Sequence, residues 1–168
     1  MAIQRIAVLG AGHGGCAAAA DLTLKGFEVR RQARRADRLN AIEVNGGITA
    51  RGVQNSLAPI SYLTTNVAAA VDGADLIMLV VPSVAHEAYA EALTPVLDAH
   101  TPVFLNPGHT GGGLHFAHAL ARAGFQGTPR LCETVTLTYI SRLEGTATVG
   151  IYGYTKRLMF SALPARET

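Results

Sequence analysis

A glycine-rich junction between a strand and a helix constrains the fold of this chain more than any other feature. Segment 3–9 is apolar and rich in β-formers, and an alanine-rich helical segment, 12–25, follows it almost at once. Glycines at positions 10, 12 and 15 give the pattern G-x-G-x-x-G at this junction. In that context the first glycine permits a tight turn, the second lets a pyrophosphate approach the backbone, and the third lets the helix pack against the strand. The sequence therefore predicts a dinucleotide-binding βαβ unit.

The start of the predicted helix supplies the phosphate contacts in such a unit. Its first N–H groups have no partner within the helix, and they lie at the positive end of the helix dipole. We predict cofactor contacts from Gly10, Gly12, His13, Gly14 and Gly15. Two alternatives stay open from the residues alone: an ordinary glycine-rich turn without a ligand, and His13 as a partly exposed bystander.

The end of the second predicted strand, 27–32, bears on the choice between NAD and NADP. NAD-selective folds place an Asp or Glu about 20 residues beyond the glycines, where the carboxylate binds the ribose hydroxyls. Ala33 stands near that position here, and Arg34 and Arg35 follow it. Guanidinium groups bind a phosphate bidentately, so the sequence predicts NADP as the cofactor, with NAD as the second choice. The alternative is a solvated basic strand end, with Asp37 as a remaining candidate for the ribose.

Beyond this unit, strand and helix patterns alternate along the chain. The alternation predicts a Rossmann-type, doubly wound α/β fold, with a mainly parallel sheet covered by helices on both faces. Residues 1–168 are expected to form one dinucleotide-binding domain, shortened near its C-terminal end. Further strands are expected at 74–81, 102–105 and 131–140, and 146–152 is expected to pair with 131–140 in a C-terminal β-hairpin. Helices are expected at 36–44, 67–71, 83–97 (capped by Ser83), 110–123 and from Thr155 onward.

Composition and charge exclude several classes of protein. Of the 168 residues, 49% are hydrophobic, which argues against disorder. A net charge of +2 gives no basis for nucleic-acid binding, and no apolar run approaches the roughly 18 residues of a membrane span. No metal-ligand spacing is present. A cytoplasmic protein is expected, because no leader-like segment precedes the first strand and the two cysteines, Cys16 and Cys132, lie in apolar stretches that favour reduced thiols.

The charged fraction is low for a self-sufficient soluble domain. It is 15%, compared with about 25% in typical domains. Segment 158–164 is also apolar. These two features predict an apolar surface that is covered by another polypeptide, most simply in a homodimer.

The chain resembles the N-terminal domain of the opine dehydrogenases, such as octopine dehydrogenase and carboxyethyl-norvaline dehydrogenase. Glycerol-3-phosphate dehydrogenase and ketopantoate reductase are more distant relatives with similar architecture. The motifs that carry the resemblance occur in the same order over nearly the whole chain. They are the glycine loop, Val80-Val81-Pro82, Asn106-Pro107-Gly108-His109-Thr110-Gly111-Gly112, Glu133-Thr134, Arg142 and Leu163-Pro164-Ala165.

The resemblance implies a reductive condensation. The amine of an amino acid and a 2-oxo acid form an imine, which NAD(P)H reduces to a secondary amine. On this basis the cofactor cleft is lined by Val81 and Pro82 and by Asn106, Pro107 and Gly108, while Glu133 and Thr134 face the amino-acid substrate. Without the resemblance, Glu133 would be a surface acid at a strand end and Thr134 an ordinary strand residue.

The family's catalytic histidine lies in a helical C-terminal domain that this chain does not include. The six histidines of this chain do not match its position. No catalytic residue is therefore predicted within the chain, and the 168 residues alone are expected to be inactive. Two other functions remain: a stand-alone NADP-binding module without catalysis, and a related reductase of 2-oxo acids such as ketopantoate.

Overall fold

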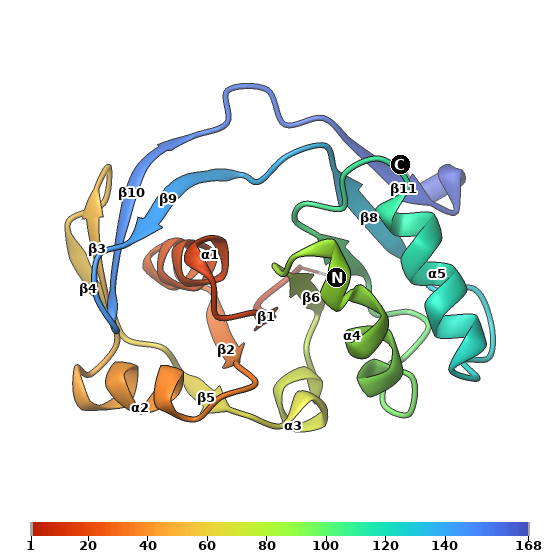
Figure 1. The fold of residues 1–168 in the computed structure, drawn as a ribbon, viewed down its shortest axis with the longest axis horizontal. Coiled ribbons are helices and arrows are strands. Elements are labelled where there is room, and N and C mark those ends of the chain that lie inside the picture. The colour runs from red at the N-terminus through yellow and green to blue at the C-terminus, as the bar shows by residue number, and fades with distance from the viewer. Residues whose placement is uncertain (1, 168) are drawn as a thin grey trace.

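A computed structural model describes residues 2–167 of the chain as a large sheet and a small sheet with a helix between them (Figure 1). The large sheet has seven strands in the order β11-β8-β7-β6-β1-β2-β5. All neighbouring pairs are parallel except β11 with β8. The strands are β1 (Arg5–Leu9), β2 (Glu28–Gln32), β5 (Tyr62–Thr64), β6 (Leu76–Leu79), β7 (Val103–Leu105), β8 (Leu131–Thr134) and β11 (Phe160–Leu163). The predicted Rossmann-type, mainly parallel fold is confirmed.

Helices cover both faces of the large sheet. One face carries α3 (Val67–Val71), α4 (His86–Leu93) and α5 (Gly112–Arg122), which bury a core with the central strands. The other face carries α1 (His13–Leu24), whose alanines at 17–20 are completely buried. Because alanine side chains are short, α1 can approach both the sheet beneath it and the small sheet above it. Helix α2 (Asp37–Val44) lies beside β5 at the edge.

The small sheet covers α1 from outside, as Figure 1 shows. Its strands are β4 (Ser56–Ala58), β3 (Ile48–Gly52), β10 (Thr148–Tyr154) and β9 (Tyr139–Leu143), in that order. Strands β9 and β10 form the C-terminal hairpin that the sequence predicts, and β10 also pairs in parallel with β3. Segment 48–64 thus supplies two strands of the small sheet and one of the large sheet.

The predicted single strand 131–140 is wrong, because it divides into β8 and β9 in different sheets. Side chains turn the backbone between them. The Thr134 hydroxyl donates to the carbonyl of Thr136 at 2.8 Å, and the Thr138 N–H donates to Asn106 Oδ1 at 3.0 Å. Such local bonds compete with the strand ladder.

The predicted helix from Thr155 is also wrong. The chain there forms β11, which pairs antiparallel with β8, and only a short 3-10 turn, Ala165–Glu167, follows. Without β11, the backbone groups along that side of β8 would lack strand partners. The sheet edge therefore overrides the local helical pattern.

The predicted helix 83–97 is shorter than expected. It begins as a 3-10 turn, Ser83–Ala85, continues as α4 and ends at Leu93. Neither the 3-10 turn nor α4 has a side-chain cap at its start, so the predicted capping by Ser83 is wrong. Pro95, two residues beyond Leu93, cannot donate a backbone hydrogen bond and disfavours a helical residue before it, which explains the early end.

In the described part of the chain, none of the helices has both the length and the apolar character that a membrane crossing requires. The same residues contain no group of three or more His, Cys, Asp or Glu side chains placed to hold a metal ion.

Candidate functional site

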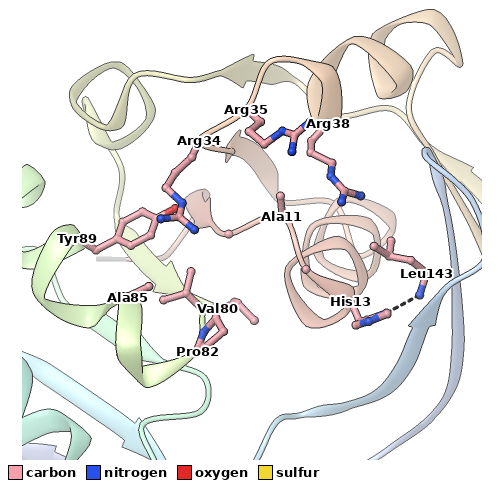
Figure 2. A pocket seen from close by; sticks show the side chains of 13 residues that line it. Ala11, His13, Arg34, Arg35, Arg38, Val80, Pro82, Ala85, Tyr89 and Leu143 are labelled. Carbon is pink, nitrogen blue, oxygen red and sulfur yellow. Dashed lines mark hydrogen bonds between the residues drawn. The ribbon is translucent and has the colours of Figure 1, made fainter.

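A pocket of about 340 Å³ opens at the carboxyl end of β1, over the start of α1 (Figure 2). Segments far apart in the sequence line it: the glycine loop, the end of β2 with the start of α2, the loop after β6 with α4, and the end of β9. Its lining residues are Gly10, Ala11, Gly12, His13, Arg34, Arg35, Arg38, Val80, Val81, Pro82, Ala85, Tyr89 and Leu143. Open α/β sheets bind ligands at this position, outside the carboxyl ends of the strands.

The three motif glycines have the spatial roles that a dinucleotide loop requires. A Cβ atom on Gly10, which has a φ of +127°, would lie 2.2 Å from the carbonyl oxygen of Val80. A Cβ on Gly15 would lie 2.3 Å from the carbonyl oxygen of Gly10. Gly12 has nothing within 4 Å of its Cβ position, so its backbone is open to the pocket. Gly10 is therefore required by the turn and Gly15 by close packing, whereas Gly12 leaves the backbone accessible from the pocket.

Gly14 and Gly15 do not line the pocket. A Cβ on Gly14 would lie 2.7 Å from Leu137 Cδ1, so this glycine packs against the segment before β9. Helix α1 itself begins without a side-chain cap and without an acidic residue in its first turn. Its first N–H groups and the positive end of its dipole are therefore available to an anion in the pocket.

His13 lines the pocket, and one of its ring nitrogens is already engaged. Its Nδ1 accepts a hydrogen bond of 2.7 Å from the backbone N–H of Leu143 (Figure 2). Since Nδ1 accepts, the neutral ring carries its proton on Nε2. The contact joins the glycine loop to the end of β9, so His13 has a structural role beside the predicted cofactor contact, which stays a prediction.

Arg34, Arg35 and Arg38 line the side of the pocket that faces His13, as Figure 2 shows. Arg35 donates to both carboxylate oxygens of Asp37 at 3.0 and 2.8 Å, and this bond holds the pKa of the Asp37 carboxyl below its usual range. Because the Asp37 carboxylate is paired with Arg35, Asp37 is a less favourable candidate for binding the ribose. Arg34 and Arg38 form no ion pair within residues 2–167.

Arg38 and Tyr89 were not predicted as site residues. Arg38 stands in the first turn of α2, and its spacing of four residues from Arg34 was the signal that could have found it. Tyr89 lies on α4, where a buried aromatic at helical spacing looks like any core residue. Its hydroxyl donates to Gln32 Oε1 at 2.9 Å, and burial raises its pKa.

The predicted cofactor residues of the later strands divide into two groups. Val81 and Pro82 line the pocket, whereas Asn106, Pro107 and Gly108 lie outside its lining. Asn106 is completely buried, donates to Thr138 Oγ1 at 2.9 Å, and precedes a cis peptide bond to Pro107. In this structure it therefore joins β7 to the segment before β9, and a cofactor contact for the turn stays a prediction.

The predicted substrate residues also lie away from this pocket. Glu133 Oε2 accepts a 2.6 Å hydrogen bond from the N–H of Gly113, so its carboxylate caps the start of α5. Gly108, Gly112 and Gly113 leave room for it, with Cβ positions 2.5–3.4 Å from its side-chain atoms. Thr134 is completely buried. Contact of either residue with an amino-acid substrate stays a prediction.

Residues 5–123 match the model of one protein family, described as the N-terminus of NAD-dependent glycerol-3-phosphate dehydrogenase. The match includes the glycine loop, the arginines and strands β1, β2 and β6 beside the pocket. The chain belongs to this family. It is an NAD(P)-binding Rossmann domain of oxidoreductase type, which confirms the superfamily that the sequence motifs indicate.

Two curated relatives are similar in sequence. The opine dehydrogenase of Arthrobacter sp. (strain 1C) is 35% identical over 166 residues, which cover 96% of this chain and 45% of that protein. The glycerol-3-phosphate dehydrogenase (NAD(P)+) of Moorella thermoacetica is 39% identical over 100 residues, covering 60% of this chain and 30% of that protein. The chain thus spans less than half the length of the curated relatives that it matches.

Solved structures show the same fold. An octopine dehydrogenase with NADH and pyruvate matches with a TM-score of 0.82 at 21% identity, over 95% of this chain and 43% of that chain. A ketopantoate reductase from Ralstonia eutropha JMP134 matches with a TM-score of 0.70 at 24% identity, over 89% of this chain and 47% of that chain.

Proposed function

We propose that this chain is the cofactor-binding domain of an opine-type oxidoreductase, which reductively condenses an amino acid with a 2-oxo acid by means of NAD(P)H. The observation that carries the proposal is the 35% identity to an opine dehydrogenase over 96% of the chain. The bound nicotinamide would supply the hydride, and this chain would hold and orient the cofactor at the glycine loop.

NADP is proposed as the preferred cofactor. Three arginines line the pocket across from the glycine loop, and no carboxylate among the lining residues would repel a 2′-phosphate. Arg34 and Arg38 are the best candidates, because Arg35 is engaged with Asp37. Relatives of this fold use both cofactors, since an octopine dehydrogenase was solved with NADH and a yersinopine dehydrogenase with NADP+.

The test of the reaction class is a substrate screen on the product of the complete native reading frame. Oxidation of NADPH that requires both an amino acid and a 2-oxo acid such as pyruvate supports the opine reaction. Oxidation with a 2-oxo acid alone supports the ketopantoate-type alternative; a ketopantoate reductase shares this fold.

The 168-residue chain alone is expected to bind cofactor without turnover. The glycine loop and the arginines are complete within it, whereas the acid–base histidine of the opine family is expected outside it. The measurement is NADPH oxidation by the purified chain with pyruvate and a panel of amino acids. Turnover at about 1 per second or faster would contradict this assignment. Cofactor binding with no turnover by the complete reading frame would favour the stand-alone binding module.

We also propose that the chain forms a homodimer. Large apolar side chains are exposed on and next to β11 and on α5, among them Met159 at 67%, Phe160 at 59% and Leu114 at 65%. Three further predictions rest on the sequence and the resemblance. They are a cytoplasmic location, the absence of nucleic-acid partners, and an amino acid and a 2-oxo acid as substrates.

A further inference from the structure

Arg31 is the largest side chain buried almost completely in this protein, with 1% of its surface exposed. It lies on β2 and reaches the first turn of α1. Its Nη1 donates to the carbonyl of Gly15 at 3.3 Å, and its Nη2 contacts Cys16 Sγ at 2.9 Å. Its Nε has no hydrogen-bond partner. The guanidinium is thus held by neutral backbone and by one cysteine, and it is not fully satisfied.

Among residues 2–167, no carboxylate forms an ion pair with Arg31. A buried cation without an anionic partner raises the free energy of the folded protein. The start of α1 adds to this cost, because the positive end of a helix dipole lies beside the guanidinium and the first turn contains no acidic residue.

The position of Arg31 connects this charge with the pocket. Cys16, which the guanidinium contacts, lies against the carbonyl of Ala11 at 3.9 Å, and Ala11 lines the pocket. Gly15, the other contact, packs directly on Gly10 of the same loop. The guanidinium therefore lies behind the glycine loop, on the side away from the ligand. Protein between two charges screens them much less than water does.

We propose that Arg31 is a buried electrostatic element of the dinucleotide site. Its uncompensated charge attracts the pyrophosphate of the cofactor through the glycine loop, without touching it. The cofactor in turn supplies the anion that the folded chain lacks. The inference rests on dinucleotide binding by this loop and does not depend on the reaction catalysed. Because both cofactors carry the same pyrophosphate, Arg31 acts equally on NAD and NADP, unlike an arginine that binds the 2′-phosphate.

The test compares Arg31→Met with the unchanged 168-residue protein by calorimetric titration with NAD and with NADP. We expect both dissociation constants to rise by the same factor, about tenfold, which corresponds to roughly 1.4 kcal/mol of lost attraction. The melting temperature of the cofactor-free protein is expected not to fall, because an apolar side chain replaces an unpaired buried charge. A merely structural role of Arg31 would lower that temperature. Should Arg31→Met fail to fold, Arg31→Gln serves with the same expected ratios.

Two further variants complete the experiment. Arg31→Lys keeps the charge and should restore most of the affinity for both nucleotides. Arg30→Met removes a positive charge from the neighbouring position and should leave both affinities unchanged. The Arg30 side chain donates to the carbonyl of Asp72 and lies 4.5 Å from the centroid of the Tyr62 ring.

Several results would overturn the inference. Unchanged affinities in Arg31→Met, or weaker binding of NADP alone, would show that the charge does not act through the loop on the pyrophosphate. An equal loss in Arg30→Met would indicate a general effect of net charge. If the unchanged protein bound neither nucleotide, the cofactor assignment itself would fail. Binding by the unchanged protein with no loss in Arg31→Met would remove this inference alone.

Discussion

At the scale of single residues, Arg34 gives the most direct test of cofactor preference. It lines the pocket and forms no ion pair in the described part of the chain. A charge-assisted hydrogen bond contributes about 1.5–3 kcal/mol, so Arg34→Ala should weaken NADP roughly ten- to hundredfold and leave NAD nearly unchanged. Titration with both cofactors measures this. Arg122→Ala, a loss of the same charge on α5, is the matched control. Equal affinity for the two cofactors, or tighter binding of NAD, in the unchanged protein would contradict the preference.

His86 makes the stability of this domain depend on pH. Its ring is completely buried, neither nitrogen has a hydrogen-bond partner, and it packs edge-on to Phe116 with centroids 6.0 Å apart. Burial lowers the pKa of His86, and the nearby His115 and His109 lower it further. When the pH falls below 6.5, the ordinary pKa of histidine, His86 is therefore protonated in the unfolded chain while it remains neutral in the folded chain.

The free energy of unfolding is accordingly expected to fall as the pH drops below about 6.5, by at most about 1.4 kcal/mol per pH unit from this group. Above that pH, His86 contributes no pH dependence, because it is neutral in both states. Urea unfolding at pH 7.5, 6.5 and 5.5 measures the slope. In His86→Phe the slope between 6.5 and 5.5 should be smaller; an unchanged slope would assign the effect to other groups.

At the scale of elements, one buried carboxylate holds the small sheet on α1. Asp21, which is 1% exposed, accepts hydrogen bonds from the hydroxyls of Tyr139 at 3.1 Å and Tyr154 at 2.8 Å, and pairs with Lys25 at 2.7 Å. Burial and the neighbouring Asp21 raise the pKa of Tyr139, so its hydroxyl remains a donor. These bonds join strands β9 and β10 to a helix more than 100 residues away.

Loss of the Tyr139 hydroxyl should therefore weaken the attachment of the small sheet. Hydrogen bonds to charged groups contribute about 1.5–3 kcal/mol, so Tyr139→Phe is expected to reduce the free energy of unfolding by that amount. Tyr152→Phe is the matched control, since Tyr152 is 54% exposed and its bond to Glu144 lies on the surface; its effect should stay within about 0.5 kcal/mol. Equal effects of the two substitutions in urea unfolding would argue against the anchor.

Element positions were predictable where local pattern and tertiary structure agree. The strand–glycine–helix junction, the short helix at 67–71 and the hairpin of β9 and β10 follow from periodicity and turn residues. The predictions fail where distant segments decide. Strand β11 exists because β8 offers a free edge, and nothing in the sequence of 160–163 indicates that edge. In the same way, the alternation of apolar and polar residues in 131–140 does not reveal that its two ends belong to different sheets.

At the scale of the whole molecule, the pocket could be predicted only in part. The spacing of the glycines located the loop after β1, and the resemblance to the opine dehydrogenases located Val81 and Pro82 after β6. Tyr89 and Leu143 reach the pocket through the packing of α4 and of the small sheet, which no spacing encodes. The bond between His13 and Leu143 spans 130 positions and depends on how the small sheet folds back over α1.

The last prediction concerns assembly at strand β11. This is the outermost strand of the large sheet; Phe160 on it and Met159 just before it are exposed. Apolar side chains exposed at an outermost strand favour association with another chain. Pairing of β11 with its own copy is antiparallel about a twofold axis, and such self-complementary contacts are the commonest in homodimers. The protein is therefore expected to sediment as a dimer at micromolar concentration, and Phe160→Lys should shift it toward monomer. Ile140→Lys on the small sheet, at a matching 58% exposure, should not. An unchanged protein that sediments as a monomer and binds no hydrophobic dye would count decisively against this interface.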